Sequence, residues 1–185
     1  MDFFLTRADF VKLTTICSRN SAEQAGIMTF KEDNNDYFFS GFEILDQDSG
    51  EIKANRPWSV TFNITSYLPR IIYEVIHGQD SEGVVVRFHT HPKKFGIDGG
   101  AIPSGADEQH IKAVQESVDN ISKKFGKQFI FVEGIISDSE IGFYYYEDGE
   151  IKRVNTFVDF VEHVPRKRKG AFSSFVAGVR EGMRR

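Results

Sequence analysis

The chain has 185 residues, of which 27% are charged, and its formal net charge at pH 7 is −4. A chain of this length can bury a core of its own as one domain, and its single cysteine, Cys17, cannot form a disulfide within it. No uninterrupted apolar segment approaches the roughly 20 residues that a membrane-spanning helix needs, and no secretory leader is visible at the start, so we expect a cytoplasmic protein that does not span a membrane.

The first element expected along the chain is a helix that begins after Thr6. Thr6 and Asp9 have the spacing of a capping box, and Leu5 with Phe10 has that of a hydrophobic staple. Phe10 and Cys17 then lie on one face of this helix, where Cys17 would be buried. Nothing beside Cys17 in the sequence offers a base or a positive charge that would activate its thiol, so we predict a core cysteine rather than a nucleophile.

Segments rich in aromatic and β-branched residues alternate with turn signals over most of the remaining chain. The hairpin dipeptides Asn34-Asn35, Ser49-Gly50 and Asp148-Gly149 indicate that much of the sheet is antiparallel. The predicted strands are residues 25–30, 36–45, 58–64, 83–89, 128–136, 142–147 and 151–157.

Two further helices are predicted between these strands, over residues 66–77 and 105–121. Each carries an apolar stripe with helical spacing, formed by Leu68, Ile71, Ile72 and Val75 in the first and by Ile111, Val114, Val118 and Ile121 in the second. The order of elements predicts an α/β fold of the α+β kind, with a mixed, largely antiparallel sheet flanked by three helices. We expect one domain over residues 1–165.

Residues 166–185 form a basic C-terminal tail. They carry seven Lys or Arg and one acidic residue, a net charge of +6, whereas residues 1–165 have a net charge of −10. Such a tail could make a weak contact with nucleic acid or an acidic partner. The favoured interpretation is a helical segment that packs Phe172, Phe175 and Val179 on its own domain, because they follow an i, i+3, i+7 spacing.

Two histidines lie at the C-terminal end of the strand predicted over residues 83–89. His89 and His91 are separated by one residue, so they would point to the same side of the sheet and could reach one ion. Zinc binds such nitrogens, commonly takes a carboxylate as its third protein ligand and keeps a fourth position for water. Asp107, at the start of the helix over 105–121, is the candidate carboxylate. Ser104 and Asp107 also form a capping box, so they could serve only to start that helix.

The stretches "HTHP" (89–92) and "SGAD" (104–107) together resemble the H-x-H-P…S-x-x-D signature of the JAMM (JAB/MPN+) zinc metallopeptidases. In that family an upstream glutamate is the general base, and Glu23 in "SAEQAGIMTF" is in the matching place. The resemblance covers about residues 5–143 and implies a JAB/MPN-like fold. It also implies one zinc ion per chain, held by His89, His91 and Asp107, with Ser104 donating to the oxyanion.

The implied activity is zinc-dependent cleavage of a peptide or isopeptide bond at the C-terminus of a ubiquitin-like protein, as in stand-alone bacterial or phage members of the family. One alternative is hydrolysis of another small amide at the same zinc site. Another is a non-proteolytic adaptor or DNA-associated protein that acts through its basic tail. For Glu23 alone, a solvent-facing charge at a strand entrance is the competing interpretation.

The loop between the two stretches, residues 93–103, is longer than the family's usual spacing and is expected to bear on substrate shape. It introduces Asp98 as a rival third ligand. Asp107 is preferred because a helix start fixes its carboxylate, whereas glycines flank Asp98. His110, one turn beyond Asp107, is expected to lie outside the ligand set.

Overall fold

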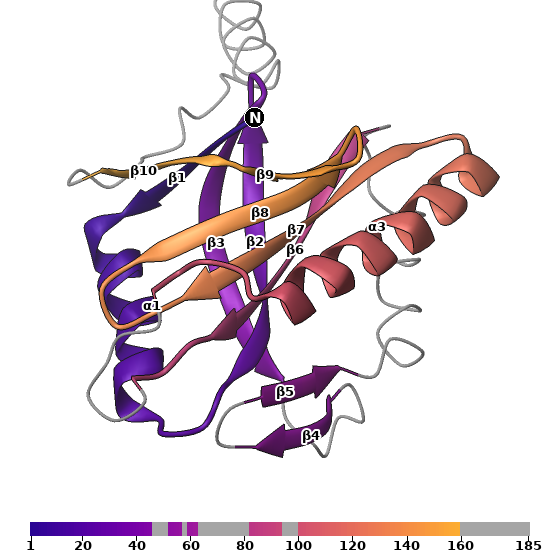
Figure 1. Cartoon of the computed structure of the whole chain (residues 1–185). Helices are drawn as coiled ribbons and strands as arrows, with labels where there is room; N and C mark the ends of the chain where they lie inside the picture. Colours follow the sequence, from indigo (N-terminus) through magenta and orange to yellow (C-terminus); the bar gives the residue numbers. More distant parts are fainter. Residues whose placement is uncertain (46–51, 57–58, 63–81, 94–99, 160–185) are drawn as a thin grey trace, which may run out of the picture.

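The computed structural model describes residues 1–45, 52–56, 59–62, 82–93 and 100–159. These residues form ten strands and two helices (Figure 1). In chain order they are β1 (Asp2–Thr6), α1 (Arg7–Arg19), β2 (Ala25–Asp33), β3 (Asp36–Leu45), β4 (Ile52–Arg56), β5 (Ser59–Phe62), β6 (Glu82–Thr90), α3 (Gly105–Phe125), β7 (Gln128–Ile136), β8 (Ile141–Glu147), β9 (Glu150–Arg153) and β10 (Asn155–Asp159).

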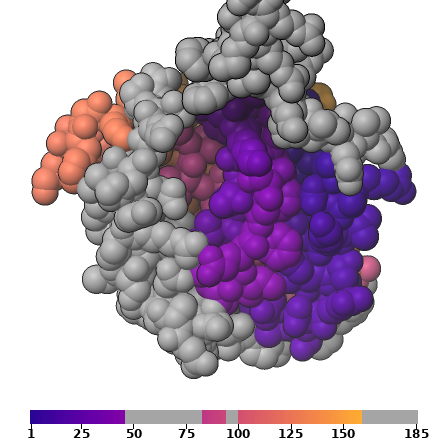
Figure 2. All heavy atoms as spheres, turned by 180° about the vertical axis from the view of Figure 1, so that it is seen from behind, coloured from indigo at the N-terminus to yellow at the C-terminus, as the bar shows by residue number. Residues whose placement is uncertain are grey.

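Eight of these strands form one mixed sheet in the order β10-β1-β3-β2-β6-β7-β8-β9, and β4 pairs with β5 in a separate hairpin. The pairs β1–β10, β1–β3 and β6–β7 are parallel, and the other neighbours are antiparallel. The two edge strands, β9 and β10, are joined through Val154, whose N–H donates to the Phe143 carbonyl at 2.9 Å. The sheet therefore curls until it is nearly closed, like a barrel. Seen from behind, β2 and β3 occupy the middle of the described surface (Figure 2).

The expected JAB/MPN-like sheet flanked by three helices is wrong. The described residues are mostly strand, and only two helices occur among them. One difference is β1, which precedes the first expected helix and pairs with β10 over five positions, from Asp2↔Asn155 to Thr6↔Asp159. Another is the predicted strand over 151–157, which is two strands divided at the buried Val154. The helix expected over 66–77 and the tail over 166–185 lie outside the described residues.

Each face of the sheet is covered by one helix, and each face has its own core. The α1 face is packed with Phe3, Leu13, Cys17, Met28, Val86, Phe88 and Phe143, and Cys17 is buried there as predicted. The α3 face is packed with Val85, Ala101, Ile111, Val114, Val118, Phe131 and Ile135. Alternate residues of β6 therefore serve opposite cores, and this alternation decides which of its polar side chains face α3.

Both helices begin at the caps that the sequence indicates. The Asp9 N–H donates to the Thr6 hydroxyl at 3.1 Å, which caps α1. Ser104 and Asp107 form a reciprocal capping box at the start of α3, and Gly126 ends that helix with a φ of +65°. None of the helices in the described part of the chain is long and apolar enough to cross a lipid bilayer.

Candidate metal centre

Strand β6 presents Arg87 and His89 to the α3 face. Val85 belongs to the α3 core and Val86 to the opposite one, so Arg87 and His89 follow Val85 on the α3 side. The end of β6 is held on both edges, because the Thr90 N–H donates to the Gln24 carbonyl at 2.8 Å and the His91 N–H donates to the Ile136 carbonyl at 2.7 Å. The strand pairing thus extends far enough to fix the backbone of both histidines.

The two histidines and Asp107 converge, as the sequence predicts. The Nε2 atoms of His89 and His91 lie 3.0 Å apart. His89 Nε2 is 3.4 Å from Asp107 Oδ1, and His91 Nε2 is 3.6 Å from Asp107 Oδ2. One ligand atom from each of the three residues falls within 4.8 Å of the others. In a tetrahedral zinc site with bonds of about 2.0–2.2 Å, neighbouring ligand atoms lie about 3.3–3.6 Å apart; the two separations from Asp107 match this range, and the two histidine nitrogens lie slightly closer together.

Asp107 is fixed by the capping box that starts α3. Both the N–H and the hydroxyl of Ser104 donate to Asp107 Oδ2 at 2.7 Å, and the Asp107 N–H donates back to the Ser104 hydroxyl at 3.3 Å. Oδ1 is the oxygen nearer to His89. The helix cap and the metal-ligand role are therefore compatible, because capping engages Oδ2 and leaves Oδ1 directed at His89.

A tyrosine on β8 anchors the segment that leads into α3. The Tyr144 hydroxyl donates to the Ala101 carbonyl at 2.6 Å, and Ala101 is 1% exposed. Gly142 allows this approach, because a Cβ there would lie 2.5 Å from the same carbonyl oxygen. The start of α3 is thus tied to the sheet three residues before Ser104.

Glu133 of β7 is a site residue that the sequence analysis missed. Its Oε1 accepts a hydrogen bond from His89 Nδ1 at 2.7 Å, and its Oε2 pairs with Arg87. Arg87 also lies over the Phe131 ring, with its guanidinium carbon 5.2 Å from the ring centroid. A signal for this pair was present in the sequence, since a charged residue interrupts each of two apolar strands, "VVVRFH" and "FIFVEG".

Negative charge around His89 changes its protonation. Burial alone would lower the pKa of His89, but hydrogen bonds to Asp107 and Glu133, together with the charges of both carboxylates, raise it to about 9. Burial likewise opposes ionisation of Asp107, yet hydrogen bonds with His89 and His91 hold the pKa of that carboxyl far below its usual range. Without a metal ion, a proton on His89 therefore supplies part of the positive charge that a cation would bring.

His110 lies outside the ligand set, as expected. Its Nε2 accepts a hydrogen bond from Arg87 Nη1 at 2.6 Å. Burial and the adjacent Arg87 charge lower the pKa of His110 to about 4. A neutral His110 therefore connects α3 to β6 across a wide range of pH.

Glu23 lies just before β2 and is 7% exposed. Ala25 pairs with His89 in the antiparallel β2–β6 ladder. The bond from the Thr90 N–H to the Gln24 carbonyl continues this pairing by one residue, so Glu23 directly precedes the last paired residue, beside the end of β6 that leads to His91. The solvent-facing alternative for Glu23 is therefore wrong.

The hydroxyl of Ser104 is engaged in this structure. A hydroxyl has one proton, and that of Ser104 is donated to Asp107 Oδ2. Ser104 can donate to a substrate oxygen only when this bond is released. Asp98, the rival third ligand, lies outside the described residues, as do residues 94–99 of the long loop.

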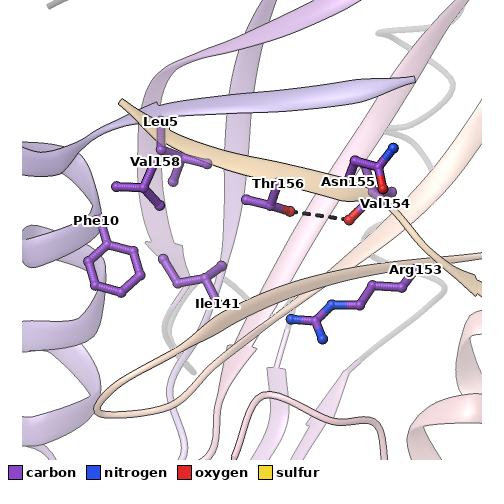
Figure 3. A pocket seen from close by; sticks show the side chains of 8 residues that line it. All are labelled: Leu5, Phe10, Ile141, Arg153, Val154, Asn155, Thr156 and Val158. Atoms are coloured by element: carbon purple, nitrogen blue, oxygen red, sulfur yellow. Dashed lines mark hydrogen bonds between the residues drawn. The ribbon is translucent and has the colours of Figure 1, made fainter. Parts of the chain in front are cut away.

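A separate hollow lies between α1 and β10 (Figure 3). Its apolar wall comes from Leu5, Phe10, Ile141 and Val158, and Arg153 lies on another side of it. Histidine and acidic residues are missing from the described residues that line it, so this hollow offers no ligand set for a metal ion.

No model of a known protein family matches this chain, and no curated protein matches it. Among solved structures, the chain is similar to the solution structure of protein DSY2949 from Desulfitobacterium hafniense, Northeast Structural Genomics Consortium target DhR27. The two share 16% sequence identity with a TM-score of 0.50, over 87% of this chain and 96% of that one. This likeness concerns the fold alone, and the metallopeptidase hypothesis stays a prediction.

Proposed function

We propose that the protein is a zinc-dependent hydrolase that cleaves a peptide or isopeptide bond at the C-terminus of a ubiquitin-like protein. The observation that carries this proposal is the convergence of His89, His91 and Asp107, whose donor atoms fall within 4.8 Å of one another. The order of these residues supports a peptidase, because "HTHP" and "SGAD" resemble the JAMM signature.

The donor set favours zinc over magnesium or calcium. Two imidazole nitrogens and one carboxylate suit zinc, whereas hard cations take oxygen ligands. Three protein ligands also leave one tetrahedral position for solvent, as in catalytic rather than structural sites. A zinc ion held there supplies a nucleophile near neutral pH and polarises the carbonyl of the scissile amide.

Glu23 would act as the general base and then as the general acid. Its carboxylate would take a proton from the attacking water and give it to the amide nitrogen as the C–N bond breaks, which is worth about 10²–10⁴-fold in rate. The burial of Glu23 and its place two residues before Ala25, which pairs with His89, support this role. Ser104 would stabilise the carbonyl oxygen as it gains negative charge, once its proton leaves Asp107.

The resemblance supports a ubiquitin-like protein as the substrate. Such a protein would be bound through its C-terminal tail in an extended form.

We also propose that the protein works in the cytoplasm. Its single cysteine, Cys17, is buried and has no second cysteine with which to form a disulfide, which suits a reducing compartment.

Cleavage assays with matched variants test this proposal. Zinc-loaded protein would be incubated with ubiquitin-like proteins that carry C-terminal extensions and with short unrelated peptides, and the products would be identified by mass spectrometry. We expect cleavage directly after the ubiquitin-like domain. Glu23→Gln should abolish it while leaving the zinc content unchanged, and Glu32→Gln, the same change at the exposed end of β2, should remain active.

The other outcomes separate the alternatives. Cleavage of short peptides alone would indicate an amidohydrolase of small substrates. Absence of hydrolysis, combined with salt-sensitive DNA binding that is lost when residues 166–185 are removed, would indicate a DNA-associated adaptor. A fully active Glu23→Gln variant would remove Glu23 from the mechanism.

A further inference from the structure

A buried ion pair adjoins the metal centre and has no role in the hydrolysis proposed above. Arg87 of β6 and Glu133 of β7 face each other in the parallel β6–β7 ladder, and Arg87 Nη2 donates to Glu133 Oε2. Their exposed fractions are 2% and 0%. The residues before them on both strands are apolar, so this pair is a polar interruption in the core of the sheet.

Stability alone gives no reason for such a pair. Removing two charges from water is costly, and well-packed apolar residues of similar volume usually stabilise a protein at least as well as a buried ion pair. The pair therefore needs another explanation, and two of its contacts with other residues lead toward the metal centre.

The first contact sets the orientation of His89. Glu133 Oε1 accepts the hydrogen on His89 Nδ1 at 2.7 Å, so Nε2 is the nitrogen without a hydrogen in the neutral ring. That Nε2 is the atom that lies 3.0 Å from His91 Nε2 and 3.4 Å from Asp107 Oδ1. A ring turned the other way would place a carbon there and would lose its bond to Glu133.

The second contact connects β6 to the helix that carries the third ligand. Arg87 Nη1 donates to His110 Nε2 at 2.6 Å, and His110 lies three residues after Asp107 on α3. A single guanidinium thus holds Glu133 on one side and the first turns of α3 on the other. Its position sets the separation between the strand that provides the histidines and the helix that provides Asp107.

We propose that Arg87 and Glu133 are positioning residues of the metal centre: Glu133 fixes the nitrogen that His89 offers to the metal, and Arg87 holds Glu133 and α3 in place. This inference rests on the proposed function in one respect, which is that the site binds zinc. Outer contacts of this kind are typically worth 10–100-fold in metal affinity.

Two double variants isolate the hydrogen bond from the buried charge. Arg87→Met with Glu133→Gln removes both charges but keeps an oxygen acceptor for His89 Nδ1. Arg87→Met with Glu133→Met removes the acceptor as well, and neither variant leaves an unpaired buried charge. We expect the second variant to bind zinc 10–100-fold more weakly than the first, in competition with a chromophoric chelator, and to give an altered absorption spectrum with Co²⁺.

The outcomes separate this inference from the proposed function. Equal zinc affinity and identical Co²⁺ spectra in the two variants would overturn the positioning role while leaving a zinc hydrolase intact. Wild-type protein that fails to bind zinc would overturn both. Should a variant fail to fold, the imidazole ¹⁵N spectrum of the zinc-loaded wild type decides instead: we expect His89 to keep its hydrogen on Nδ1, and coordination through Nδ1 would overturn the inference.

Discussion

Gln24 and Thr90 are joined by two hydrogen bonds across 66 residues of sequence. The Gln24 N–H donates to the Thr90 hydroxyl at 2.8 Å, and the Thr90 N–H donates to the Gln24 carbonyl at 2.8 Å. Thr90 is fully buried. This junction extends the pairing of β2 with β6 by one residue beyond its last ladder pair, and so holds the residues next to the proposed base, Glu23, and the proposed ligand, His91.

The role of the Thr90 hydroxyl in this junction can be tested with Thr90→Val, which keeps the shape of the side chain. The Gln24 N–H would lose its acceptor in a partly buried place, so we expect the free energy of unfolding to fall by about 1–3 kcal/mol. We also expect hydrolysis to slow while zinc content stays unchanged, because Glu23 is displaced and the ligands are not. Denaturant titration and zinc analysis check this prediction. Thr15→Val on α1 is the control, and an equal loss of stability in that variant would count against a special role for Thr90.

Ser104 has two roles that substitutions can separate. Ser104→Ala should lower the free energy of unfolding by about 0.5–2 kcal/mol, whereas glycine at a helix N-cap costs only a few tenths. Both variants lack the hydroxyl, and loss of one oxyanion donor slows a reaction by about 10²–10³. We therefore expect Ser104→Gly to be nearly as stable as the wild type but as inactive as Ser104→Ala. An active Ser104→Gly variant would leave Ser104 with the capping role alone.

The stability of the metal-free protein should be greatest near pH 6.5. The pKa of His89 is raised to about 9, so its contribution to the free energy of unfolding is complete below pH 6.5 and is lost as the pH rises through 9. The pKa of His110 is lowered to about 4, so its contribution is present above 6.5 and is lost as the pH falls toward 4. Thermal unfolding in the presence of a metal chelator, followed from pH 4.5 to 9.5, measures both losses of stability.

Two variants show which histidine causes each decline in stability. His89→Asn should flatten the decline at high pH, and His110→Asn should reduce the decline at low pH. A metal-free wild type that gains stability between pH 6.5 and 9 would contradict the hydrogen bonds assigned to His89.

Tyr144 should influence zinc binding although it is no ligand. Tyr144→Phe removes the donor to the buried Ala101 carbonyl, which lies on the segment that leads to Ser104 and Asp107. We expect a loss of about 1–3 kcal/mol in the free energy of unfolding and weaker zinc binding. Tyr145→Phe on the same strand is the control. Unchanged zinc affinity in Tyr144→Phe would show that the start of α3 holds its place without this anchor.

Features that depend on neighbouring residues could be predicted from the sequence. The caps at Thr6 and Ser104 involve partners three residues away, and both are confirmed. The common side of His89 and His91 follows from the alternation of a strand. Their approach to Asp107 was predicted because a helix start directly follows the loop after the strand.

Features that depend on distant pairing could not be predicted in this way. The residues of β1 pair with those of β10 across about 150 positions, and neither segment alone indicates its partner. The same limit applies to Glu133, whose contact with Arg87 depends on the register between β6 and β7. A charge inside an apolar strand indicates that some partner exists, but only the register identifies it.

Zinc content is the measurement that tests the central claim most directly. The purified wild type should hold one zinc ion per chain by elemental analysis after dialysis. His91→Ala and Asp107→Ala should each lose it, and Glu116→Gln, on the exposed face of α3, should keep it. A wild type without zinc, or His91→Ala and Asp107→Ala variants that retain it in full, would contradict the claim that these residues form a metal centre.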